Sequence, residues 1–270
     1  MGFKETKLAR YLRLYKVFVK NCLMAQMEYR FNFLISVFIE TAFLFIKLLY
    51  VIVVFGVGVN INGMSPYQVL MCIGLYTILT GIMDTIYFPN IAKLPQLIQS
   101  GDLDFYITKP CSLQFLVSFR NFDLGLAVPN VIGGVAMVVV AWVNLKLSLD
   151  FATLLGFLFF SVLGVVLTYP ILMIPTLLSF WVVKTDQMFT ILWAIWDFNN
   201  MPMGIYNRVI KGIGTFVMPV FIITNFAPMF VMGQLSVFHM IWSVFITIAL
   251  LIVLKLFFRF AVSRYSSASS

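Results

Sequence analysis

The feature that most constrains this chain is a series of apolar runs, several of them long enough to cross a lipid bilayer, which takes about 20 helical residues. Hydrophobic residues make up 62% of the 270 positions and charged residues only 10%, whereas soluble domains are about half apolar and about a quarter charged. A globular protein of this size has too little interior to bury so much apolar surface. The surplus must face lipid, so the chain is predicted to be an all-α membrane protein.

About six membrane spans are predicted, with five and seven as the limits. The apolar runs lie at residues 31–57, 67–88, 115–143, 151–183, 187–200 and 237–258. The fourth run is expected to bend at Pro170 or Pro175, where a helix loses a backbone hydrogen bond. The fifth run is only about long enough for a short span.

Residues 201–233 are apolar but are interrupted repeatedly by helix breakers. These are Pro202, Gly204, Gly212, Gly214, Pro219 and Pro228. Irregular backbone at membrane depth survives only where protein or a water-filled cavity satisfies its polar groups. The stretch is therefore predicted to form one or two short re-entrant helices before the last span.

The net charge of +8 is interpreted as a topology signal and not as a sign of nucleic acid binding. Placing both termini in the cytoplasm puts most of the 18 lysines and arginines on the inner side, in agreement with the positive-inside rule. The chain is expected to be a multi-pass protein of the cell (plasma) membrane, the inner one where there are two. Its expected partners include membrane lipids and no nucleic acid.

Residues 1–30 are predicted to form a cytoplasmic amphipathic interfacial helix ahead of a single transmembrane domain at 31–270. Leu8, Tyr11, Leu12, Tyr15, Val19 and Cys22 recur at helical spacing, and Arg10, Arg13, Lys16 and Lys20 fall on the opposite arc. Such a helix is suited to lie along an anionic inner leaflet. The alternative is a basic flank that only fixes the orientation of the spans.

Residues with catalytic potential are scarce. The sequence contains no Gly-x-x-x-x-Gly-Lys-Ser/Thr, no Gly-x-Ser-x-Gly and no His-Glu-x-x-His, so a P-loop and two hydrolase signatures are missing. Three cysteines and one histidine have no metal-ligand spacing. We expect no catalytic residue, metal or cofactor on this chain, and a role in transport or scaffolding instead of catalysis.

The segment at 90–112, between the second and third predicted spans, is the longest polar stretch. An amphipathic piece at 91–98 leads into Gly101, two acids and a lysine before Pro110. A folded cytoplasmic element of this kind is typical of a docking site, and an ordinary polar loop is the alternative.

Two motifs carry a resemblance to a known family. Gly101-x-Leu103-Asp104-x-Tyr106-x-x-Lys109-Pro110 resembles a signature of the ABC-2 exporter permeases, in the branch whose ATPase is a separate chain. The stretch Met201-Pro-Met-Gly-Ile-Tyr206, with Phe216-Val-Met-Pro219 and Phe226-Ala-Pro228, is similar to the second signature of that branch. Asn207 stands where the family usually has proline, so the turn there is expected to differ.

The resemblance implies a permease subunit of an ATP-driven exporter, with two ATPase copies that carry Mg-ATP and a second permease, identical or homologous. It implies a coupling helix that docks on the ATPase through Gly101, Leu103, Asp104, Tyr106, Lys109 and Pro110. It also implies an outer gate that includes Pro202, Tyr206, Pro219 and Pro228. The alternative function is a stand-alone secondary transporter or channel, which would need inverted repeats and a relay of ionisable groups; neither is visible in the sequence. The substrate stays open.

Two charged residues lie inside the first predicted span. Glu40 and Lys47 are seven residues apart, roughly 10 Å along the helix axis, which is too far for a direct pair. An ionised group near the bilayer centre costs several kcal/mol unless it finds a partner or water. Each is assigned to the translocation path or gate, with structural pairing as the alternative. Asp84, Arg120 and Asp123 are expected near the inner interface.

Overall fold

The computed structural model describes residues 6–57, 63–182 and 186–265, and in these ranges it is helical, with no strand. Within the described residues, five helices are long and apolar enough to cross a membrane, and a bent pair of helices makes a sixth crossing if it is counted as one span. The five are α2 (Arg30–Val57), α3 (Pro66–Ile86), α8 (Leu124–Asn144), α9 (Phe151–Thr176) with its continuation η1 (Leu177–Phe180), and α13 (Val237–Ser263). The prediction of an all-α membrane protein is confirmed. The first five residues of the predicted interfacial helix, the predicted span end at 183 and the last five residues lie outside the described ranges.

The predicted span at 115–143 is wrong at its start, because the chain breaks between α7 (Leu113–Phe119) and α8. Asn90 holds the break: its side chain accepts a hydrogen bond from the Asn121 backbone (2.7 Å) and donates one to the Asn121 carbonyl (2.8 Å). The Asp123 carboxylate then caps α8 by accepting from the Gly125 N–H at 3.0 Å. The fourth span, in contrast, stays helical through Pro170 and Pro175.

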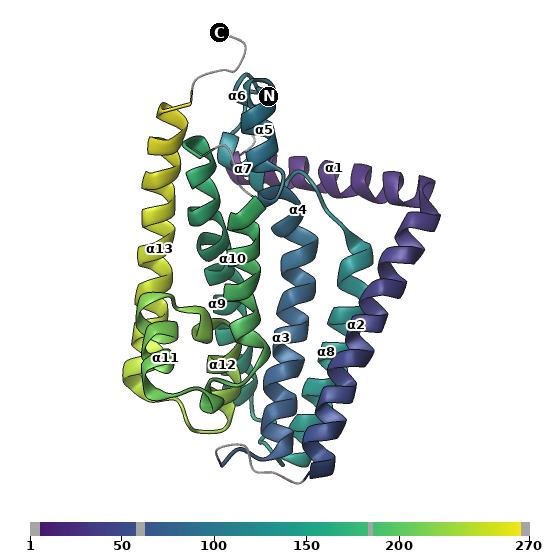
Figure 1. Cartoon of the computed structure of the whole chain (residues 1–270), viewed down its shortest axis with the longest axis vertical. Helices are drawn as coiled ribbons and strands as arrows, with labels where there is room; N and C mark the ends of the chain where they lie inside the picture. The colour runs from purple at the N-terminus through teal and green to yellow at the C-terminus, as the bar shows by residue number, and fades with distance from the viewer. Residues whose placement is uncertain (1–5, 58–62, 183–185, 266–270) are drawn as a thin grey trace.

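The predicted fifth span at 187–200 is too short to cross alone. Helix α10 (Asp186–Asp197) has 12 residues, about 18 Å of helix, against a hydrocarbon core of about 30 Å. The 3-10 turns η2 (Phe198–Asn200) and η3 (Met203–Ile205) follow it. Since α9 and α13 end together, with the Phe180 ring against Tyr265, α10 and residues 198–207 carry the chain back to the other end (Figure 1).

The stretch predicted to be re-entrant is bent. Helix α11 (Arg208–Gly212) and the π-helical turn η4 (Ile213–Val217) form one arm, and α12 (Val220–Val231) forms the other. The two arms meet at 102°, and Pro219 lies at the bend as the residue before α12. The pair lies at the end of the bundle opposite α1 (Figure 1).

Helix α3 is the centre of the bundle. Most of its residues are buried, whereas 6% of the α2 window is buried. Its closest neighbour is α8, and glycines allow the approach: a Cβ added at Gly134 would lie 2.7 Å from the Gly74 carbonyl oxygen and 2.8 Å from the Ile78 nitrogen. The main core joins α3 to α9, α12 and α13 through side chains such as Leu75, Leu167, Phe226 and Leu254. Helix α1 (Lys7–Glu28) lies across one end of this bundle (Figure 1).

We predict that Gly134→Ala lowers the stability of the solubilised chain by about 1–3 kcal/mol, because the new methyl group would meet backbone atoms that cannot move aside. Gly56→Ala is the matched control, since nothing lies within 4 Å of a Cβ at Gly56. Thermal unfolding of both variants is the measurement. Equal melting temperatures for Gly134→Ala and the wild type would contradict the close α3–α8 packing.

Candidate coupling and translocation sites

The segment that follows α3 folds into three short helices at the α1 end of the bundle: α4 (Phe88–Ile91), α5 (Leu94–Ser100) and α6 (Leu103–Ile107). Gly101 ends α5 with φ 78°, a left-handed conformation that glycine adopts without a Cβ clash. The turn brings Leu103 back into the core, where it is 1% exposed. The predicted coupling motif is therefore a folded element anchored to the bundle.

The other predicted coupling residues divide between inward and outward positions. Asp104 is half-buried and lies beside Tyr265, just after α13; burial and the Asp104 charge raise the pKa of this phenol. The Tyr106 ring lies under the Arg120 guanidinium, 4.8 Å from its centroid. Lys109 and Pro110 are exposed.

Two exposed apolar residues of this element were not predicted from the sequence. Phe105 is 69% exposed and Ile107 is 44% exposed, and both lie close in sequence to the exposed Lys109. One signal for them was present in the sequence: they are apolar residues that stand among charged residues of a polar segment. With Lys109 and Pro110 they give this segment exposed side chains of both apolar and basic type.

Helix α1 holds the chain that leads from this element into α8. The Arg10 guanidinium donates to the Pro110 carbonyl at 2.6 Å, and the Ser112 N–H donates to the Tyr11 hydroxyl at 3.0 Å. Near the other end of α1, the Gln26 side chain donates to the Phe122 carbonyl at 2.7 Å and accepts from the Leu124 N–H at 3.3 Å. These hydrogen bonds hold the segment against α1, which continues into α2.

The predicted path residue Glu40 pairs with a neutral side chain from another helix. Its Oε2 accepts a hydrogen bond of 2.7 Å from Asn130 Nδ2 of α8, and the same amide also donates to the Leu126 carbonyl at 3.1 Å. Asn130 is fully buried. The carboxylate of Glu40 is therefore fixed to the α2–α8 contact.

Lys47, the second predicted path residue, lies over the Tyr76 ring of α3, 5.2 Å from its centroid. Its ammonium group is within electrostatic range of Glu40, Asp84 and Asp197, which are carboxylates of α2, α3 and α10. Asp84 is 8% exposed and lies in the last turn of α3, close to the end of the bundle where α1 lies. We call Glu40, Lys47, Tyr76, Asp84 and Asp197 the buried charge cluster after its buried members Tyr76 and Asp84; Glu40 and Lys47 are half-buried and Asp197 is exposed.

The buried charge cluster is joined to the irregular segment through aromatic contacts. The Tyr76 ring packs on Trp196 of α10, with centroids 5.9 Å apart, and Trp196 Nε1 donates to the Thr80 hydroxyl at 3.3 Å. Trp196 directly precedes Asp197 and the end of α10. A shift of α10 therefore moves a carboxylate relative to Lys47.

The predicted gate residues lie in two segments, the irregular stretch at 198–207 and α12 with the residue that precedes it. Pro202 and its neighbours are held by α12: Asn225 Oδ1 accepts from the Met203 N–H at 2.7 Å. The Tyr206 ring packs on Phe221, with centroids 5.1 Å apart. Pro219 precedes α12 and Pro228 lies within it, so all four predicted gate residues belong to α12 or to the segment that packs on it.

The sequence model of a family described as "ABC-2 family transporter protein" matches residues 40–269. The match includes the coupling motif, the buried charge cluster and the bent pair of helices, and it begins after α1. No curated protein and no solved structure matches the chain.

We predict that Lys47→Met destabilises the solubilised chain by about 1–2 kcal/mol, because removing one partner of a partly buried charge pair leaves the carboxylates uncompensated. Adding Asp84→Asn should recover much of the loss by removing a facing charge. Lys255→Met, at an exposed position of α13, is the matched control. Additive losses of melting temperature in the Lys47→Met/Asp84→Asn double variant would contradict the cluster.

Proposed function

We propose that this chain, which belongs to the ABC-2 transporter family, is the permease subunit of an exporter that is driven by ATP hydrolysis on a separate chain. Family membership and five span-length apolar helices support a membrane-embedded transport subunit. ATP coupling, the partners and the direction of transport are parts of the proposal.

The energy source is assigned to a partner because of a motif that the sequence lacks. Its sequence lacks a P-loop, the element by which many ATPases bind nucleotide phosphates. Mg-ATP is therefore placed on a separate ABC ATPase, two copies per exporter. The chain contributes the path and the surface on which the ATPase acts.

The observation that carries the proposal is the folded element at 101–110. Leu103 is buried in the bundle, while Phe105, Ile107 and Lys109 are exposed at its apex. A rigid anchor beneath an exposed apex is what a docking element needs in order to convert the movement of a partner into movement of the spans. The hydrogen bonds from α1 extend this connection to α2.

A second permease, identical or homologous, is proposed to complete the path. The buried charge cluster lies between α2, α3 and α10, and α2 has few protein neighbours along its length. A path between two permeases would place the buried charge cluster and the segment at 186–207 close to the cargo. In the proposed orientation both termini and the 101–110 element lie in the cytoplasm and the chain lies in the plasma membrane.

The buried charge cluster is also the feature that favours the alternative, a stand-alone secondary transporter. Such a transporter uses membrane-embedded ionisable groups to bind the coupling ion. The two functions differ in one observable: the secondary transporter works on an ion gradient without ATPase, and the permease needs ATP hydrolysis by its partner.

We predict that Gly101→Val lowers the ATP turnover of the reconstituted permease–ATPase complex about tenfold or more. A β-branched residue at φ 78° is strained by about 1–3 kcal/mol, which displaces Leu103 and the apex. Gly63→Val is the matched control, because Gly63 has φ 83° in the loop at the opposite end, with nothing within 4 Å of its Cβ. Asp104→Ala and Lys109→Ala should show smaller losses with normal insertion.

The proposal fails if Gly101→Val and both alanine variants retain wild-type turnover. It also fails if Gly63→Val is as damaging as Gly101→Val, since backbone strain alone would then explain the loss. Ion-gradient-driven flux by the purified chain without ATPase would replace it with the secondary transporter.

A further inference from the structure

Asn130 of α8 carries a buried oxygen atom without a hydrogen-bond partner. The side chain is fully buried, and its Nδ2 donates to Glu40 Oε2 and to the Leu126 carbonyl. Because both neighbours of this nitrogen are acceptors, they fix the orientation of the amide. Its Oδ1 accepts no hydrogen bond from any residue in the described part of the chain. A buried carbonyl oxygen of this kind can serve as a ligand for a water molecule or a cation.

The Asn130 side chain stands at the junction of three helices. A Cβ added at Gly81 of α3 would lie 2.9 Å from the Asn130 Cβ, so the side chain begins against α3, and it ends at Glu40 of α2. Asp84 lies one turn further along α3, on the same face of the helix as Gly81. Because side chains tilt toward the N-terminus of their helix, the Asp84 carboxylate is directed back toward the level of Gly81 and Asn130.

Helix α2 packs closely on α8 on both sides of this junction. A Cβ added at Gly125 would lie 3.2 Å from the Ser36 Cβ, and one added at Gly133 would lie 2.5 Å from the Leu44 side chain. Ser36, Glu40 and Leu44 follow one another at intervals of four residues, so they share one face of α2. This packing holds the Glu40 carboxylate at the junction with α3 and α8.

The Asp84 carboxylate also lacks a direct partner. The residue is 8% exposed, and it forms no hydrogen bond or ion pair with a residue that the structure describes. It lies within electrostatic range of Glu40, so two carboxylates and an amide oxygen gather where α2, α3 and α8 meet. Among the described residues no three histidine, cysteine, aspartate or glutamate side chains are grouped to hold a metal. The spacing of cysteines and histidines gives no sign of this group, because its ligands are oxygens from three helices.

The charges at the junction are balanced by one further positive charge. Glu40 and Asp84 are two carboxylates, and Lys47, which is in electrostatic range of both, is one cation. Lys47 lies over the Tyr76 ring, and Tyr76 precedes Asp84 by eight residues, roughly 12 Å along α3. The ammonium group is therefore too far from Asp84 for a direct pair. A single additional charge would neutralise the group, which favours a monovalent ion over a divalent one.

We propose that Glu40, Asp84 and Asn130 form a binding site for a monovalent alkali cation, sodium or potassium, at the junction of α2, α3 and α8. Hard cations prefer oxygen ligands, and these side chains present two carboxylates and one free amide oxygen to the junction. Two carboxylates and one amide contain about five oxygens in all, fewer than the roughly six to eight that calcium takes. The number of ligands and the charge thus favour the same class of ion.

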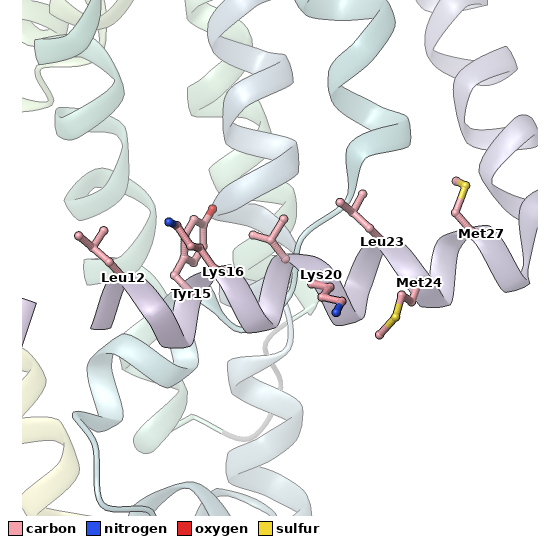
Figure 2. A pocket seen from close by; sticks show the side chains of 8 residues that line it. Leu12, Tyr15, Lys16, Lys20, Leu23, Met24 and Met27 are labelled. Carbon is pink, nitrogen blue, oxygen red and sulfur yellow. The ribbon is translucent and has the colours of Figure 1, made fainter. Parts of the chain in front are cut away.

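A bound cation holds α2 against the rest of the bundle. Figure 2 shows Met27 at the end of α1 from which α2 leaves, and little of the length of α2 is buried. A cation shared by Glu40, Asp84 and Asn130 connects α2 to α3 and α8 at once. By mass action, the ion favours the conformation in which α2 is docked. The site does not rest on the proposed ATP coupling, so either can fail without the other.

The test is the melting temperature of the purified full chain in detergent at constant ionic strength, with sodium chloride or potassium chloride replacing choline chloride. An ion at about ten times its dissociation constant should raise the melting temperature by about 3–6 °C. Sodium-22, or rubidium-86 as a tracer for potassium, should bind to saturation at a single ion per chain.

Glu40→Gln and Asp84→Asn each remove one carboxylate at nearly constant size, and each should weaken the apparent affinity for the ion about tenfold or more. Every variant is compared with itself in choline chloride, so a variant that is less stable in all salts still gives a result. Glu28→Gln is the matched control, because it makes the same change at an exposed position of α1, and it should keep the wild-type response.

Equal melting temperatures of the wild type in sodium, potassium and choline would overturn the site. A wild-type response in both Glu40→Gln and Asp84→Asn would do so too, as would a loss in Glu28→Gln equal to that in Glu40→Gln. Calcium that binds more tightly than both alkali ions at equal ionic strength would contradict a monovalent site. Stabilisation by lower pH with no response to alkali ions would show that the carboxylates share a proton and not a metal ion.

Discussion

The polar groups of the backbone find no water in the hydrocarbon core, so each one must be satisfied within the protein. The segment at 186–207, in which the short helix α10 is followed by 3-10 turns, depends on this constraint. Residues 198–207 leave α-helical geometry for 3-10 turns joined by extended backbone, and α12 compensates with side chains that are buried among apolar neighbours. Asn225 accepts from the Met203 N–H, and the Thr224 hydroxyl donates to Asn199 Oδ1 at 3.0 Å. A charged side chain within a span likewise needs partners in place of water, and Lys47 lies over the Tyr76 ring and near three carboxylates. Removing the polar side chains of α12 would thus leave the Met203 N–H and the Asn199 Oδ1 without these hydrogen-bond partners. The cost of an unsatisfied buried polar group is several kcal/mol.

A continuous series of contacts connects the 101–110 element to α2. The 101–110 element is fixed to the core by Leu103 and to α1 through Pro110. Helix α1 passes into α2 after Tyr29, and α2 carries Glu40 and Lys47. In the proposed function, a push on the apex reaches the buried charge cluster through side-chain contacts and short connections. Because the cluster couples α2, α3 and α10, it is the point at which such a push would alter the path.

Much of the fold follows from the sequence, because apolar length and breaker residues are read directly from residue types. The all-α class and the bend near Pro219 are examples. The start of the third span was not predictable: it is set by Asn90, about 30 residues away in sequence, whose hydrogen bonds stop the helix at Asn121. The sequence indicated Glu40 and Lys47 because charge is rare in a span, but their partners Asn130 and Tyr76 look ordinary until folding brings three helices together. The burial of Asp84, two residues before the end of α3, was not predictable either, because it depends on how α3 packs against its neighbours.

The most direct test of the central claim is a cross-link between the apex and the partner ATPase. A single cysteine replaces Phe105 in a chain that lacks Cys22, Cys72 and Cys111, and a second chain carries its cysteine at Ser148, in the loop between α8 and α9. The co-expressed ABC ATPase is treated with a short bifunctional thiol reagent in membranes. The account predicts that Phe105→Cys cross-links to the ATPase and that Ser148→Cys does not. A cross-link from Ser148→Cys with none from Phe105→Cys would contradict docking at the apex and with it the assignment of this chain as the driven subunit.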